Sequence, residues 1–149
     1  MYFACHGKNQ NLIPADRRSA INITELLEAL SVPNIGAIEF MHFSCCEMVS
    51  SDNRKQSLAE YLTASNAKWA SGYSKSADWL QSMLLDLASI AGLAVPYHNE
   101  GKKKNVKVSF RGRNFLKNYN QLVRELGFSR AYKNRRGEIE LFPPRQRNT

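Results

Sequence analysis

Short apolar runs alternate with longer amphipathic segments over the first ninety residues of the chain. The apolar runs are rich in strand formers and occupy residues 2–5, 37–43 and 68–73. The amphipathic segments place apolar side chains at helical spacing and occupy residues 23–30, 58–62 and 79–90. Strands that alternate with helices predict an α/β fold, with a largely parallel sheet covered by helices on both faces.

Local signals predict the ends and the buried faces of two helices. Asn22 and Glu25 have the spacing of a capping box at the start of the first helix, and Pro33 is expected to end it. The third helix is expected to close at Gly92. Its apolar residues are expected to form a buried stripe, made of Trp79, Leu80, Met83, Leu84, Leu87 and Ile90.

The pattern changes after residue 92. The elements predicted there are a strand at residues 106–110, a helix at 115–126 and a hairpin of two strands at 128–132 and 138–142. We therefore predict two units. Residues 1–92 form the core, and residues 93–149 form a basic α+β C-terminal extension that packs on the core or follows it.

Composition indicates a folded domain without a membrane segment. The chain has 149 residues, of which 43% are apolar and 23% charged, as in ordinary globular proteins. No apolar run reaches the roughly 18 residues that a membrane helix needs, and the opening residues lack the basic segment of a signal peptide. We expect a cytoplasmic protein with no membrane partner.

The net charge of +8 is unevenly distributed. Residues 101–149 carry +11, whereas residues 1–100 carry −3. This asymmetry favours an acidic partner for the C-terminal region, of which nucleic acid is the commonest. The candidate contacts are Lys102, Lys103, Lys104, Arg111 and Arg113. A solvated basic face without a partner explains the same charge equally well.

Two of the predicted strands end in chemically capable residues. The first is expected to end in a tight turn at His6 and Gly7, before a polar loop over residues 8–18. The second ends at residues 44–47 (SCCE). If these strands are neighbours, an imidazole and a thiol meet at the same edge of the sheet. An imidazole that accepts the proton of a thiol turns the cysteine into a nucleophile.

The same residues resemble a known family. Residues 3–7 (FACHG) resemble the histidine motif of caspase-like cysteine peptidases, and residues 43–47 (FSCCE) resemble the Leu-Ser-Ala-Cys-Glu motif of the CHAT-type branch of that superfamily. Aligning the second motif position by position puts Cys46 at the nucleophile. The resemblance covers roughly residues 2–90 and implies a caspase-like sheet with a short N-terminal part.

The resemblance implies a cysteine endopeptidase. Cys46 would attack the scissile carbonyl and form a thioester, and His6 would act as general base and then as acid. Backbone N–H groups of Gly7 and Cys46 would stabilise the oxyanion. No metal and no organic cofactor is expected, and the substrate would be a protein or peptide.

The resemblance also implies a substrate pocket shaped by residues 73–78. The candidate pocket residues are Tyr73, Ser74 and Asp78. Asp78 would attract a basic side chain of the substrate. An acid in the first turn of a helix, where it favours the helix dipole, is the commoner role for such a residue.

Other functions remain open from the residues alone. The chain is alternatively a catalytically inactive caspase-like scaffold, or a basic module that binds nucleic acid or an acidic partner. A zinc site built from Cys5, His6, His42, Cys45 and Cys46 lacks the usual ligand spacing, and His42 is expected to be a packed or hydrogen-bonded residue of a strand. An unpaired sheet edge favours a regulatory partner or a homo-oligomer.

Overall fold

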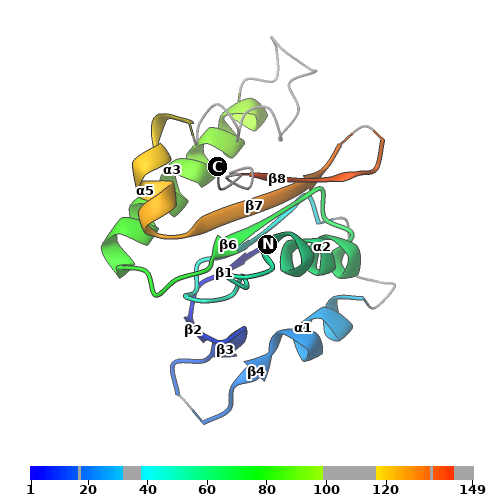
Figure 1. Ribbon diagram of the computed structural model, residues 1–149, viewed down its shortest axis with the longest axis vertical. Helices are drawn as coiled ribbons and strands as arrows, with labels where there is room; N and C mark the ends of the chain where they lie inside the picture. Colours follow the sequence, from blue (N-terminus) through cyan, green and yellow to red (C-terminus); the bar gives the residue numbers. More distant parts are fainter. Residues whose placement is uncertain (17, 32–37, 99–116, 135, 143–149) are drawn as a thin grey trace.

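The computed structural model describes residues 1–16, 18–31, 38–98, 117–134 and 136–142. The strands are β1 (Tyr2–Phe3), β2 (His6–Lys8), β3 (Asn11–Ile13), β4 (Ile21–Asn22), β5 (Phe40–Phe43), β6 (Trp69–Tyr73), β7 (Phe128–Lys133) and β8 (Ile139–Phe142). The helices are α1 (Ile23–Leu30), α2 (Arg54–Ser65), α3 (Trp79–His98) and α5 (Asn120–Glu125). A central sheet has the order β1-β5-β6-β7-β8, and a small antiparallel sheet has the order β2-β3-β4 (Figure 1).

The central sheet is mixed: the three strands predicted within residues 1–92 run parallel, as expected, and two antiparallel strands extend the sheet. β1, β5 and β6 run parallel, whereas β7 is antiparallel to β6 and β8 is antiparallel to β7. β7 and β8 form the hairpin that the sequence predicts, and this hairpin extends the sheet beyond β6. The predicted core and the predicted C-terminal extension therefore share one sheet.

The segment around His6 differs from the predicted turn. β1 ends at Phe3, and His6 begins β2, which pairs with β3 in a hairpin. The hairpin turns at Asn9 and Gln10, whose φ angles are 49° and 60°. These left-handed values suit a two-residue hairpin turn, because their twist matches that of the strands. Part of the predicted polar loop is therefore strand β3.

Helices cover the central sheet on its two faces. In Figure 1, α1 and α2 lie on one side of the sheet, and α3 and α5 lie on the other. The α2 side holds the larger apolar cluster, which includes Met41, Phe43, Leu58, Tyr61, Leu62, Ala70 and Ala131. The α3 side holds a smaller one, made of Tyr73, Leu85, Val123, Leu126 and Phe128.

The predicted capping box of α1 is confirmed. The Asn22 side chain accepts a hydrogen bond from the Thr24 N–H at 2.8 Å, and the Glu25 carboxylate accepts one from the Asn22 N–H at 3.3 Å. The helix ends at Leu30, ahead of the predicted stop at Pro33. α3 runs on past the predicted stop at Gly92 and ends at His98.

The predicted buried stripe of α3 is wrong. Trp79 is 72% exposed and Leu84 is 54% exposed, and Leu80, Met83 and Leu87 are exposed as well. The buried face of the helix is instead formed by Ser82, Leu85, Asp86 and Ser89. The reason is that the sheet surface beneath α3 carries polar groups, and these groups need polar partners from the helix.

Some predicted elements lie outside the described residues. They are the strand at residues 106–110 and the first two residues of the helix predicted at 115–126. The described part of that helix contains α5. Within the described part of the chain, no helix is long and apolar enough to cross a membrane.

Candidate active site

The two strands that precede the candidate residues are neighbours. β1 pairs in parallel with β5, with Tyr2 opposite His42 and Phe3 opposite Phe43. The ladder continues beyond the strands, since the Ser44 N–H donates to the Phe3 carbonyl at 2.8 Å. The segments that lead to His6 and to Cys46 therefore leave the sheet side by side at its carboxyl edge.

Gly7 packs directly against the cysteine turn. A Cβ atom on Gly7 would lie 2.1 Å from the Cys46 carbonyl oxygen and 2.9 Å from the Cys45 Cβ. Since backbone cannot yield to such a clash, only glycine fits at this position. The close approach fixes the residue after His6 against the carbonyl of Cys46.

The two adjacent cysteines have different surroundings. Cys45 is 1% exposed, and its Sγ lies 3.1 Å from the Cys5 Sγ and 3.4 Å from the Phe3 carbonyl oxygen. Burial, together with the hydrogen bond to Cys5, raises the pKa of the Cys45 thiol well above its usual range. Cys46 is half-buried, and its Sγ accepts a hydrogen bond from the Ala77 N–H at 3.3 Å.

The imidazole of His6 is on the surface. His6 is an exposed residue of β2, and it makes no side-chain hydrogen bond within the part of the chain that the structure describes. The His6 ring and the Cys46 thiol are therefore not bonded to each other. The Cβ position of Gly7 faces Cys46, so the side chain of His6, the preceding residue of the strand, projects to the opposite face of β2. Catalysis by this pair therefore requires the segment around His6 to rearrange when substrate binds.

The turn after Cys46 is held from both sides. Glu47 has a φ angle of 55°, and its N–H donates to the Lys75 carbonyl at 3.3 Å. Its own carbonyl accepts from the Gln10 N–H at 3.1 Å, and its carboxylate accepts from the Asn9 N–H at 3.2 Å. A hollow of about 460 Å³ opens beside this turn, lined by Asn9, Gln10, Glu47, Val49, Ser50, Ser51 and Ser74.

The predicted pocket residues have separate roles. Ser74 lines the hollow beside Glu47. Tyr73 is fully buried, and its hydroxyl donates to the Asp86 carboxylate. Asp78 caps α3, because its Oδ1 accepts from the N–H groups of Leu80 and Gln81, at 3.0 Å each. Asp78 therefore has the structural role that we considered the commoner one.

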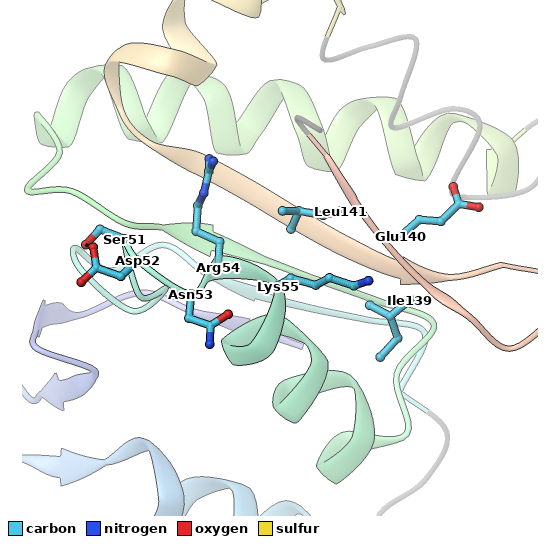
Figure 2. A pocket seen from close by; sticks show the side chains of 8 residues that line it. All are labelled: Ser51, Asp52, Asn53, Arg54, Lys55, Ile139, Glu140 and Leu141. Atoms are coloured by element: carbon cyan, nitrogen blue, oxygen red, sulfur yellow. Dashed lines mark hydrogen bonds between the residues drawn. The ribbon is translucent and has the colours of Figure 1, made fainter. Parts of the chain in front are cut away.

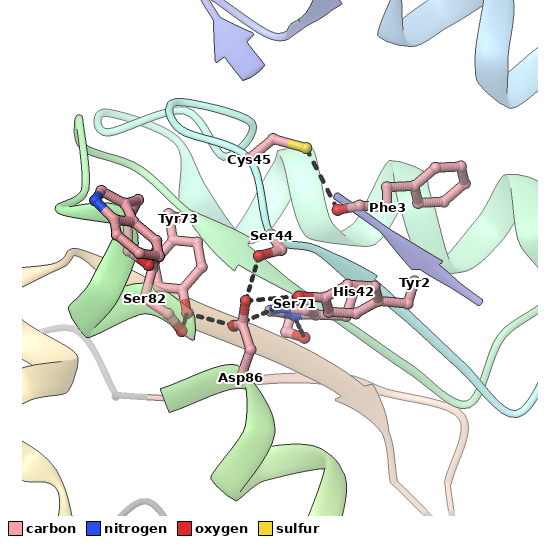
Figure 3. Close-up of polar contacts among 10 residues, drawn as sticks. Tyr2, Phe3, His42, Ser44, Cys45, Ser71, Tyr73, Ser82 and Asp86 are labelled. Carbon is pink, nitrogen blue, oxygen red and sulfur yellow. Dashed lines mark hydrogen bonds and ion pairs between the residues drawn. The ribbon is translucent and has the colours of Figure 1, made fainter. Parts of the chain in front are cut away.

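A buried polar network lies under the site, and we did not predict it. The Asp86 carboxylate accepts hydrogen bonds from the Tyr2, Ser44 and Tyr73 hydroxyls, and its Oδ1 lies 2.6 Å from the His42 Nε2 (Figure 3). The His42 Nδ1 lies 2.7 Å from the Ser71 hydroxyl. An acid within an apolar helix and a histidine within a strand were the available signals, and the expectation of a hydrogen-bonded His42 is confirmed.

The network keeps Asp86 ionised. Burial alone would raise the pKa of Asp86, but the hydrogen bond and the charge of His42, followed by the Ser44 and Tyr73 hydroxyls, lower it overall. Ser44 stands two residues before Cys46, so the network anchors the strand end that presents the cysteine.

A larger hollow of about 580 Å³ lies between the start of α2 and β8 (Figure 2). Its lining is mixed in charge and consists of Ser51, Asp52, Asn53, Arg54, Lys55, Ile139, Glu140 and Leu141. None of these is a predicted site residue.

The predicted nucleic-acid contacts, Lys102, Lys103, Lys104, Arg111 and Arg113, lie outside the described residues. Among the residues that are described, no three His, Cys, Asp or Glu side chains are grouped so that they can hold a metal ion. No protein-family model, curated protein or solved structure matches this chain.

Proposed function

We propose that the protein is a cysteine endopeptidase with Cys46 as nucleophile and His6 as general base. The observation that carries the proposal is the contact between Gly7 and the Cys46 carbonyl, which places the histidine and cysteine segments against each other at the ends of neighbouring parallel strands. Ligands and substrates of open α/β sheets bind at this edge.

The difference between the cysteines supports Cys46 over Cys45. A nucleophile must meet substrate and give up its proton, and Cys45 is buried with a raised pKa. Cys46 is half-buried, next to a hollow that opens at Glu47. The resemblance of residues 43–47 to the CHAT-type motif selects the same cysteine.

The proposed reaction has two steps. Cys46 attacks the scissile carbonyl while His6 takes the thiol proton, and His6 then protonates the leaving amine as the tetrahedral intermediate collapses to a thioester. N–H groups of Gly7 and Cys46 stabilise the oxyanion. Water, activated by His6, hydrolyses the thioester and releases the second product.

Labelling with a cysteine-directed peptidyl electrophile tests the proposal. The residue next to the electrophile is varied across a panel, and the labelled residue is located by peptide mass spectrometry. We expect Cys46 to be labelled in the wild type and no labelling in Cys46→Ala. We expect His6→Ala to slow labelling by roughly 10²–10⁴-fold, and Lys8→Ala, an exposed change on the same strand, to leave it unchanged.

A control separates loss of the site from loss of the fold. Cys45→Ala should retain labelling, and circular dichroism should show that each variant is folded. Labelling of Cys45 in place of Cys46, or equal rates in wild type and His6→Ala, would contradict the proposal.

A catalytically inactive scaffold is the second candidate. It is favoured by the exposed His6 ring, which makes no hydrogen bond to Cys46. In that case a simple alkylating reagent would modify Cys46 at the same rate in wild type and His6→Ala, and no peptidyl electrophile in the panel would be preferred.

A further inference from the structure

Cys5 and Cys45 form a close thiol pair that the proposed peptidase chemistry does not use. Their sulfur atoms are 3.1 Å apart, although the residues are 40 positions apart in the chain. Both cysteines are free in the structure. Cys5 is immediately followed by His6, and Cys45 is immediately followed by Cys46.

The register of the sheet explains why these two thiols meet. Phe3 lies opposite Phe43 in the parallel pair of β1 and β5. Two residues further along each chain are Cys5 and Cys45, and the hydrogen bond from the Ser44 N–H to the Phe3 carbonyl keeps the two segments side by side beyond the strands, so that the thiols meet. Adjacent strands are about 4.8 Å apart, within the range of Cα separations that a disulfide spans.

Cys46 is kept apart from this pair. The Cys46 sulfur accepts its hydrogen bond from the Ala77 N–H, on the α3 side. Cys45 instead belongs to the apolar cluster on the α2 side, where Cys5 packs against it. A bond between the adjacent Cys45 and Cys46 would also require strained geometry.

We propose that Cys5 and Cys45 are a redox modification site, which a small-molecule disulfide such as oxidised glutathione converts into a reversible intramolecular disulfide. With no third ligand grouped beside them among the described residues, the pair has the geometry of a dithiol and not of a metal site. The bond links the residue before His6 to the residue before Cys46.

The reaction follows ordinary thiol–disulfide exchange. Cys5, the more exposed of the two, loses its proton and attacks one sulfur of the reagent, so that a mixed disulfide forms and one reagent thiolate leaves. Cys45, which is held 3.1 Å from the Cys5 sulfur, then attacks that sulfur within the same molecule, and its proton passes to the second reagent thiolate as this thiolate leaves. Two protein thiols are oxidised by two electrons, and the reagent disulfide is reduced to two thiols.

The test is a redox titration of the full chain. The protein is equilibrated with mixtures of reduced and oxidised glutathione and quenched with acid, and its free thiols are alkylated before peptide mass spectrometry. We expect a linked peptide that contains Cys5 and Cys45, with Cys46 alkylated. The linked peptide should increase with the share of oxidised glutathione and disappear on treatment with a dithiol reductant.

Single variants provide the matched controls. Cys5→Ser, a change at a half-buried position, should abolish the linked peptide, whereas Cys46→Ser should leave it in full yield. As a second measurement, oxidation should raise the midpoint of thermal unfolding in the wild type and in Cys46→Ser but not in Cys5→Ser, because the cross-link restricts the unfolded chain. A bond that includes Cys46, or three alkylated cysteines at every ratio, would overturn the proposal, whether or not the protein is a peptidase.

Discussion

The two faces of the central sheet are built on opposite principles. On the α2 face, Met41, Phe43 and Ala70 pack against apolar residues of α2, and the Phe43 and Tyr61 rings lie 4.9 Å apart. On the α3 face, the same strands present His42, which contacts Asp86, and Ser71, which contacts His42. His42 is 5% exposed and Asp86 is 1% exposed, so these polar groups are as inaccessible as the apolar ones.

The difference continues into β7. Arg130 lies opposite Ser71 in the register, on the α3 face, and is fully buried. Its guanidinium carbon is 5.0 Å from the centre of the Phe142 ring and 5.5 Å from that of Trp69. When apolar side chains are shortened, the free energy of unfolding falls roughly in proportion to the atoms removed. When one partner of a buried polar group is removed, the group left without a partner adds its full desolvation cost. The two faces should therefore respond differently to substitution.

Asp86→Ala is expected to have the largest effect. It removes the acceptor shared by Tyr2, Ser44, Tyr73 and His42, and leaves the buried side chains of Tyr73 and His42 without it. We expect the free energy of unfolding, measured by denaturant titration, to fall by about 3–5 kcal/mol. Asp86→Asn, which keeps the size and some hydrogen bonds of the side chain, should lower the free energy of unfolding by less. A loss below 1 kcal/mol in Asp86→Ala would mean that the network contributes little.

The neighbouring leucines of α3 compare a buried and an exposed position directly. Leu85 is fully buried, and Leu84 is 54% exposed. Leu85→Ala should lower the free energy of unfolding by about 2–5 kcal/mol, and Leu84→Ala should change it by no more than about 0.5 kcal/mol. The same denaturant titration measures both. If the two losses were reversed, the apolar stripe of α3 would be the buried one after all.

The error in the predicted stripe shows what the sequence could not reveal. Helical spacing identified α3 correctly, but the rule that its apolar side faces inward assumes an apolar surface beneath it. His42 and Ser71 supply a polar surface, and they are recognised as such only when β5 and β6 are aligned in register. The partner of Asp86 is therefore a property of the tertiary structure.

The strands and the site show the same division. Local patterns predicted β5, β6 and the β7–β8 hairpin, because their apolar and aromatic content is local information. The pairing of β7 with β6 and its antiparallel direction are long-range properties, and the local pattern did not predict that the hairpin joins the parallel strands in one sheet. At the site, the sequence motifs identified His6 and Cys46 as candidate residues. The contact between Gly7 and Cys46 and the thiol pair depend on how β1 and β5 are aligned, which the motifs do not specify.

A double-mutant cycle sharpens the comparison within the polar face. His42→Phe and Asp86→Asn each disturb the contact between the ring and the carboxylate, which are 2.6 Å apart. The decrease in the free energy of unfolding, measured by denaturant titration, should be smaller in the double variant than the sum of the two single decreases by about 0.5–3 kcal/mol, because the contact is lost only once. The pair Met41→Ala and Asp86→Asn, from opposite faces, is the control and should be additive.

The pH dependence of stability is the smallest expected effect, and its direction depends on the pKa shift of Asp86. The folded protein lowers the pKa of Asp86 below its ordinary value of about 3.9. Between the folded and the ordinary pKa, the unfolded chain binds more protons than the folded one, so stability decreases as the pH falls. The stabilising contribution of the ionised Asp86 is complete above about pH 4 and is lost as the pH falls through the folded pKa.

We therefore expect the free energy of unfolding to fall more steeply below about pH 4 in the wild type than in Asp86→Asn. Denaturant titration at a series of pH values measures both. Parallel curves for the two proteins would mean that Asp86 titrates alike in the folded and unfolded chains, and the polar face would then owe its stability to hydrogen bonds without a buried charge.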